Sequence, residues 1–141
     1  MKNILVLCTG NSCRSQIAHA YFDQLTDPQK VNTYSAGIET HGLNPMAVEV
    51  LLDDGIDISH HSSNHIDEYA NIDFDYVITV CDHAKEVCPY VPSRAQQFHH
   101  NFTDPAKATG NAEQIWNVFK SVRDDIKQFV TQFIEQHQLN A

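Results

Sequence analysis

A cysteine-centred turn between a strand and a helix is the feature that most constrains the fold. The apolar run 4–7 leads directly into residues 8–15, which read C-T-G-N-S-C-R-S, and a helical pattern begins where this turn ends. Such a turn directs backbone N–H groups and the positive end of the helix to one place, and Arg14 adds a guanidinium there. The sequence therefore predicts that Cys8 lies in a cradle for a small tetrahedral anion.

Strands alternate with helices along the rest of the chain. Strand candidates are residues 3–8, 31–36 and 74–80, with a weaker one at 96–102. One helical pattern ends before Pro28, and another begins at Asn44-Pro45 and closes at Gly55. This alternation predicts an α/β fold with a parallel sheet, whose ligand site lies at the carboxyl ends of the strands. Cys8 is at such an end, and residues 1–141 form one predicted domain.

The last helical pattern is the longest and carries one apolar stripe. We expect this stripe to cover the sheet and Arg123, Asp124 and Lys127 to lie on the opposite, solvated side. The stripe consists of Ile115, Val118, Phe119, Val122, Ile126, Phe129, Val130 and Phe133.

Charge and composition narrow the class of partner. Nine Lys and Arg against 18 Asp and Glu give a formal net charge of -9, which would repel a nucleic-acid backbone. No apolar stretch reaches the roughly 18 residues of a membrane span. We expect no nucleic-acid or membrane partner, a cytoplasmic location, and four cysteines with catalytic, redox or metal-binding roles rather than a disulfide scaffold.

The cradle suits nucleophilic chemistry. The helix N-terminus, the loop amides and Arg14 all favour negative charge on Cys8, and a thiolate is the reactive form of cysteine. The Ser15 hydroxyl can donate a hydrogen bond to that sulfur, and Asn11 can support the turn because Asn tolerates left-handed backbone. The alternative is a buried strand cysteine with Arg14 on the surface, but the flanking strand and helix favour the functional interpretation.

Motifs along the whole chain resemble the superfamily of low-molecular-weight protein tyrosine phosphatases and thioredoxin-coupled arsenate reductases. They are C-T-G-N-S-C-R-S-Q from Cys8, Tyr34-Ser35-Ala36-Gly37, Asn44-Pro45, Gly55-Ile56-Asp57-Ile58-Ser59 and Asp104-Pro105. The resemblance implies a three-layer α/β/α fold with a four-stranded parallel sheet. It also implies that Cys8 is the nucleophile, that Asp104 is the general acid, and that the oxyanion is bound by Thr9, Gly10, Asn11, Ser12, Cys13, Arg14 and Ser15. Without it, Asp104-Pro105 reads as the start of a turn.

The positions of two further cysteines resemble those in the arsenate reductase branch of this superfamily. Cys81 ends the third strand and Cys88 follows seven residues later, so a thiol could attack an intermediate on Cys8 and pass the disulfide on. The resemblance implies a relay from Cys8 to Cys81 to Cys88, with arsenate as substrate and reduced thioredoxin as electron source. We expect no bound cofactor, a monomer, and a segment 81–92 that loosens on oxidation. We expect Cys13 to pack inward, with a Cys8–Cys13 disulfide as the alternative.

Three alternatives remain open. The first is a phosphatase using Cys8, Arg14 and Asp104, although residues 106–110, A-K-A-T-G, lack the aromatic side chains with which tyrosine phosphatases of this family line their cleft. The second is a zinc site formed by Cys81, His83 and Cys88 with His99 or His100, whose spacing fits no known finger. The third concerns potassium: some arsenate reductases bind it, but His19 and Asn64 replace two anionic ligands here. We place His60, His61 and His65 on a solvated loop.

Overall fold

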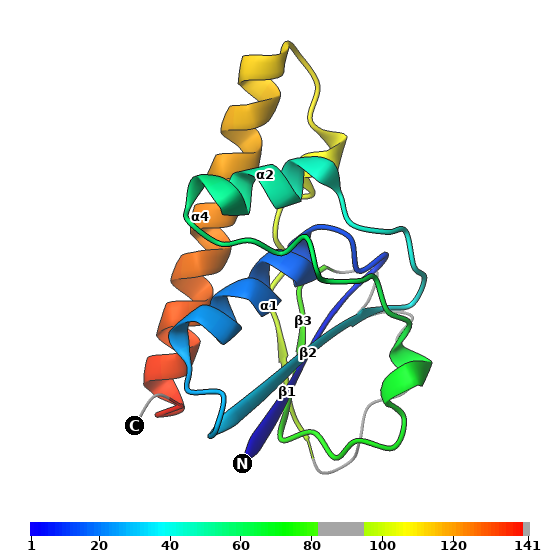
Figure 1. Cartoon of the computed structure of the whole chain (residues 1–141), viewed down its shortest axis with the longest axis vertical. Coiled ribbons are helices and arrows are strands. Elements are labelled where there is room, and N and C mark those ends of the chain that lie inside the picture. Colours follow the sequence, from blue (N-terminus) through cyan, green and yellow to red (C-terminus); the bar gives the residue numbers. More distant parts are fainter. Residues whose placement is uncertain (82–94, 140–141) are drawn as a thin grey trace.

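The structure is a computed structural model of the chain, and it describes residues 1–81 and 95–139 (Figure 1). Its strands form one parallel sheet in the order β2-β1-β3-β4, which confirms the predicted four-stranded parallel sheet. The elements are β1 (Lys2–Cys8), α1 (Arg14–Leu25), β2 (Val31–Gly37), α2 (Pro45–Asp53), the 3-10 turn η1 (Ile66–Tyr69), β3 (Tyr76–Thr79), β4 (Gln96–His99), the 3-10 turn η2 (Pro105–Lys107) and α4 (Ala112–Gln136).

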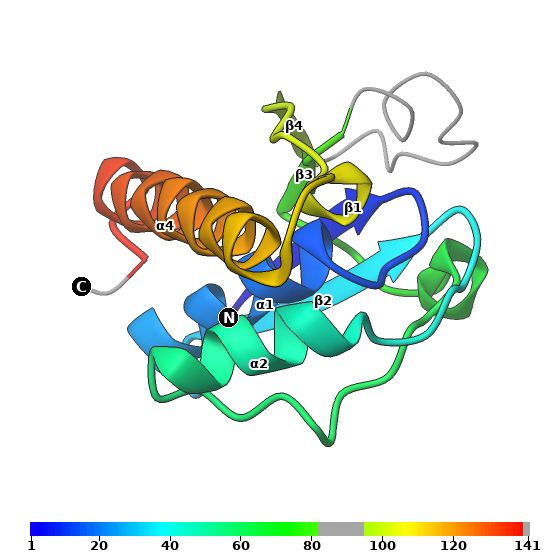
Figure 2. The ribbon, with the colours of Figure 1, turned by 90° about the horizontal axis from the view of Figure 1, so that it is seen from above.

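The described helices α1, α2 and α4 gather on one side of the sheet (Figure 2). Phe133 of α4 contacts the rings of Phe22 in α1, Tyr76 in β3 and Phe98 in β4, with centroids 5.8, 5.5 and 5.0 Å apart. Since Tyr76 and Phe98 are two residues out of register, they project from the same face of the sheet. One aromatic side chain therefore joins α4 to the helix and the two strands beside it.

The segment before β3 covers the opposite face. Tyr34 of β2 projects there and meets the rings of Tyr69 and Phe74 at 5.1 and 5.5 Å. The central strand β1 is consequently buried on both faces, with Ile4 and Leu5 at 0% and 1% exposure. A strand covered on both sides reads as a continuous apolar run, and this is why β1 is evident from the sequence.

Strand and helix boundaries follow local signals to different degrees. The Asn44 side chain accepts hydrogen bonds from the backbone N–H groups of Met46 and Ala47, with Pro45 in the first turn of α2, which confirms the predicted start. The predicted strands 74–80 and 96–102 are shorter, 76–79 and 96–99. Single backbone bonds such as Phe102 N–H to Val80 O, at 3.1 Å, extend the pairing without a regular ladder.

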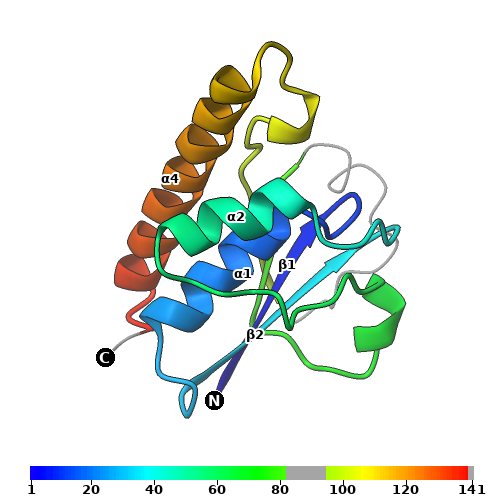
Figure 3. The same cartoon turned by 45° about the horizontal axis from the view of Figure 1, so that its top comes forward.

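The prediction for Arg123 is wrong. Its side chain is buried rather than solvated, and its Nη1 donates to Val50 O at 2.9 Å and to Asp53 Oδ2 at 3.0 Å. Both partners lie at the C-terminal end of α2, whose last carbonyls lack helical partners and attract a cation. Arg123 thus ties α2 to α4, and Figure 3 shows these two helices side by side.

Within the described ranges, 1–81 and 95–139, no helix has the length and apolarity that crossing a bilayer requires.

The carboxyl ends of β1 and β3 lie together at one edge of the sheet, beneath the 100–107 segment (Figure 1). This arrangement brings Cys8, Cys81 and Asp104 to one pocket.

Candidate active site

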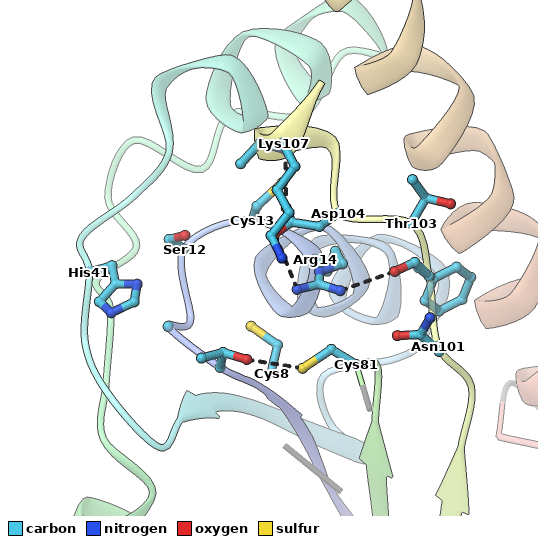
Figure 4. A pocket seen from close by; sticks show the side chains of 14 residues that line it. Cys8, Ser12, Cys13, Arg14, His41, Cys81, Asn101, Thr103, Asp104 and Lys107 are labelled. Carbon is cyan, nitrogen blue, oxygen red and sulfur yellow. Dashed lines mark hydrogen bonds and ion pairs between the residues drawn. The ribbon is translucent and has the colours of Figure 1, made fainter. Parts of the chain in front are cut away.

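A pocket at this edge collects most of the predicted site residues (Figure 4). Among the described residues, it is lined by Cys8, Thr9, Gly10, Ser12, Cys13, Arg14, His41, Cys81, Asn101, Phe102, Thr103, Asp104, Ala106 and Lys107. Two predicted cradle residues, Asn11 and Ser15, are not in its wall. Both are completely buried behind it, so we assign them to the support of the cradle.

Neighbouring backbone holds the cradle open toward the pocket. The carbonyls of Thr9, Gly10 and Ser12 accept hydrogen bonds from the N–H groups of Glu39, His41 and Asn44, each at 3.0 Å. Because the C=O and N–H of a trans peptide point in opposite directions, carbonyls held outward turn the following amides inward. The loop therefore presents N–H donors to the pocket beside the N-terminus of α1.

Asn11 supports this loop from behind through several side-chain hydrogen bonds. Its φ is +49° and its side chain is buried, as predicted from the tolerance of Asn for left-handed backbone. Its Oδ1 accepts from the N–H of Asn64 at 2.8 Å and from Gln16 Nε2 at 3.1 Å, while its Nδ2 donates to Ser15 Oγ at 2.8 Å. The amide therefore joins the first turn of α1 to the distant segment at Asn64.

This geometry fixes the direction of the bond to Cys8. A backbone N–H can only donate, so the contact with Asn64 assigns Oδ1 of Asn11 and leaves Nδ2 facing Ser15. Ser15 Oγ accepts from Nδ2, which leaves its own proton for the Cys8 sulfur 2.9 Å away. The hydroxyl is thus oriented to donate to a thiolate, as the sequence predicted.

Cys13 is the unreactive thiol of the site. Burial, followed by the nearby Cys8 and Asp104, raises its pKa to about 12, so it stays protonated at neutral pH. It is 4% exposed, in agreement with the predicted inward packing. Cys8, Cys13 and Cys81 are all free thiols, and no Cys8–Cys13 disulfide is present.

Arg14 and Asp104 face each other across the cradle. Arg14 Nη1 donates to Phe102 O at 3.0 Å, and Nη2 lies 3.6 Å from Asp104 Oδ2. Asp104 also caps η2 by accepting from Ala106 N–H at 3.0 Å. Asp104 therefore both starts the η2 turn and faces the pocket, because its Oδ1 caps the turn while its Oδ2 faces Arg14.

Cys81 extends from the end of β3 toward Cys8 (Figure 4). It is buried at 2% exposure, and its sulfur lies 3.3 Å from Thr9 Oγ1. The structure thus brings the first two thiols of the predicted relay into one pocket. Cys88, His83 and the predicted behaviour of 82–92 lie outside the described residues.

The structure bears on the zinc and potassium alternatives through the contacts of the residues that they involve. Among the described residues, no group of three or more His, Cys, Asp or Glu side chains has an arrangement suited to a metal ion. His19 bonds Ser35 Oγ at 2.8 Å and lies 3.2 Å from Asp23 Oδ2. Asn64 directs its amide to Glu68 Oε1 at 3.3 Å. These two side chains therefore contact other protein groups, and the replacement of two potassium ligands stays a prediction from the sequence.

Gln16 is a supporting residue to which the sequence assigned no role. It is 1% exposed, and its Nε2 donates to the backbone oxygens of Asn11 and Ser62. Its Oε1 lies 3.1 Å from His61 Nδ1. No sequence pattern indicated this role, because two of the partners, Ser62 and His61, come from a distant segment.

His61 departs from the solvated-loop prediction. Its ring lies 4.9 Å from that of His19 and is half-buried, whereas His60 is exposed. Burial, with the neighbouring His19 and His60, lowers the pKa of His61 to about 4. The ring therefore stays neutral through the range in which a free histidine takes up a proton.

This lowered pKa predicts a loss of stability in mild acid. The unfolded chain binds a proton at His61 below about pH 6.5 while the native chain does not until about pH 4, so the free energy of unfolding falls across that window, by up to about 3 kcal/mol. Urea unfolding of His61→Asn should depend less on pH than wild type between about pH 7 and pH 4.5. His60→Asn is the exposed control, and an unchanged slope in His61→Asn would contradict this origin.

Known proteins share this fold and much of this sequence. The family model for low molecular weight phosphotyrosine protein phosphatases matches residues 3–141. Arsenate reductases from Halalkalibacterium halodurans and Bacillus subtilis are 46% and 47% identical to the chain, each match covering 95% of this chain and 96% of the relative. The solved structure of an arsenate reductase in its oxidized state superposes with a TM-score of 0.82 at 27% identity, covering 96% of this chain and 98% of the other.

The low molecular weight protein tyrosine phosphatase of T. tengcongensis shares the fold at 24% identity and a TM-score of 0.81, covering 96% of this chain and 99% of that one. The cysteine cradle at the end of β1 and the match over nearly the whole chain define a class of enzymes with the low molecular weight phosphatase fold. The chain belongs to the low molecular weight phosphotyrosine protein phosphatase family.

Proposed function

We propose that this protein reduces arsenate to arsenite, using Cys8 as nucleophile and Cys81 as the second thiol. The observation that carries the proposal is the presence of Cys8 and Cys81 in the wall of one pocket. Hydrolysis of a phosphocysteine needs only water, whereas reduction of arsenic requires two electrons from a pair of thiols. Relatives named arsenate reductase, 46% and 47% identical over most of the chain, support the same conclusion.

The first step is displacement at arsenic. Arsenate binds to the inward N–H groups of the cradle and to Arg14, and the Cys8 thiolate attacks the arsenic atom. Asp104 protonates the departing oxygen, which leaves as water because a protonated oxygen is the better leaving group. The product is an arsenic(V) ester on the Cys8 sulfur, and the Ser15 hydroxyl has released that sulfur from its hydrogen bond.

The second step transfers the electrons. The Cys81 thiolate attacks the Cys8 sulfur, the sulfur–arsenic bond breaks, and its electron pair remains on arsenic, which departs as arsenite. The Thr9 hydroxyl, 3.3 Å from the Cys81 sulfur, can donate to it while it is an anion. We propose that Cys88 then attacks Cys81, freeing Cys8, and that thioredoxin reduces the Cys81–Cys88 disulfide of a monomeric enzyme.

A coupled assay tests this proposal. Arsenate should cause NADPH oxidation in the presence of the protein, thioredoxin and thioredoxin reductase, with one arsenite formed for each NADPH consumed. Leaving out thioredoxin should abolish the signal, and replacing it with glutaredoxin and glutathione identifies another donor. Absence of arsenate-dependent arsenite formation with every thiol donor would overturn the proposed function.

A phosphatase is the second candidate, because Cys8, Arg14 and Asp104 alone could hydrolyse a phosphate ester. Asp104 lies 3.6 Å from Arg14, so its carboxyl group is close enough to the cradle to protonate a leaving oxygen in either reaction. Hydrolysis of p-nitrophenyl phosphate at a rate exceeding arsenate reduction would favour this alternative.

A further inference from the structure

Lys107 is a cation of the pocket wall that neither the cradle nor the proposed thiol relay uses. It lines the pocket together with Cys8, Arg14 and Asp104. Its side chain is exposed and forms no ion pair with another described residue. In a chain with 18 acidic and 9 basic residues, a lysine in the wall of an anion site that has no ion-pair partner among the described residues calls for a functional explanation.

The 3-10 turn η2 fixes the direction of this side chain. Asp104 begins the turn, Pro105 is buried in its first position, and the N–H of Lys107 donates to Asp104 O at 3.2 Å. With three residues per turn, side chains at positions i and i+3 lie on the same side. Figure 4 shows Lys107 extending from η2 toward the Arg14–Asp104 pair.

The charges of the pocket explain what this lysine can do. Arg14 is the other permanent cation in the described wall, and Asp104 lies 3.6 Å from it, so the two charges largely offset one another whenever Asp104 does not hold the proton that it donates in the proposed first step. A reactive Cys8 thiolate then leaves the wall net negative where a doubly charged oxyanion must bind. Lys107 restores the balance, because each positive charge attracts such a ligand in proportion to the ligand's charge.

We propose that Lys107 is a specificity-determining residue that binds the outer oxygens of doubly charged inorganic oxyanions in this pocket. The inference deepens the proposed function, since arsenate at neutral pH is such an anion, but it depends only on anion binding. A flexible ammonium at the mouth of the pocket suits a bare oxyanion, whose outer oxygens are charged and reach the solvent side.

Protection of Cys8 from alkylation by inorganic phosphate tests this directly. Iodoacetamide labelling of Cys8, followed by peptide mass spectrometry, gives the phosphate concentration that halves the rate for each variant relative to its own phosphate-free rate. Lys107→Met should raise this concentration by about threefold to tenfold, and Lys107→Arg should restore it to within about twofold. Lys2→Met, which removes the same charge at the opposite end of β1, is the matched control. Equal values for Lys107→Met and Lys2→Met would overturn the proposal.

Two further measurements separate charge from shape and binding from catalysis. Lys107→Met should weaken protection by sulfate more than by perchlorate, because both are tetrahedral but only sulfate is doubly charged; equal weakening would contradict an electrostatic role. In the reductase assay, the KM for arsenate should rise while kcat changes little. If wild type reduces no arsenate, the proposed function fails, and the phosphate experiment still decides the role of Lys107.

Discussion

Asn11→Ala should lower the free energy of unfolding by roughly 3–5 kcal/mol and slow alkylation of Cys8 at neutral pH. The substitution deprives the Asn64 N–H and Ser15 Oγ of their buried partner, and each unsatisfied group costs about 1–3 kcal/mol unless water replaces it. Gln16 Nε2 keeps the backbone oxygens of Asn11 and Ser62. Alanine at a φ of +49° adds about 1–2 kcal/mol of backbone strain. Urea unfolding measures the first effect and iodoacetamide labelling the second.

Two variants separate the causes. Asn11→Gly removes the same hydrogen bonds but accepts positive φ, so it should be more stable than Asn11→Ala by about 1 kcal/mol. Ser15→Ala leaves the Asn11–Asn64 bond intact and removes the donor to Cys8 2.9 Å away, so it should slow Cys8 alkylation with a smaller loss of stability. If Ser15→Ala labels as fast as wild type, the hydroxyl does not activate the thiolate.

Local chemistry explains which parts of the fold and site were predictable. The cradle needs a strand, a turn and a helix start within residues 4–15, and Asn44-Pro45 starts α2 through its own side chain and ring. The parallel sheet was predictable because its central strand β1 is a continuous apolar run, as expected for a strand that is covered on both faces. Features that depend on neighbouring residues in the chain are visible in the chain itself.

Features that depend on contacts between distant segments were missed. Arg123 lies on the polar side of the α4 pattern and is buried only because the end of α2 packs over it. Gln16 and His61 meet across 45 positions, and no periodicity encodes that distance. In the sequence, Lys107 is one of several small or polar residues after Asp104. Only the 3-10 turn η2 in the structure shows that it lines the pocket.

Cys81→Ser should abolish arsenite formation while leaving anion binding intact, a loss of at least about 100-fold in turnover. Serine cannot accept the Cys8 sulfur as a disulfide partner, so the sulfur–arsenic ester can only revert to arsenate by hydrolysis. Its hydroxyl can still contact Thr9 Oγ1, now 3.3 Å from the Cys81 sulfur, which preserves the fold. The coupled NADPH assay and direct arsenite detection measure the loss.

Phosphate binding and ester hydrolysis provide the internal controls for this variant. Phosphate should protect Cys8 from alkylation in Cys81→Ser as it does in wild type, and any hydrolysis of p-nitrophenyl phosphate should persist, because the cradle, Arg14 and Asp104 are unchanged. If Cys81→Ser continued to produce arsenite at the wild-type rate, electrons would have to reach arsenic by a route that bypasses Cys81. A phosphatase would be indifferent to the substitution in both assays, so the contrast between them assigns the second thiol its role.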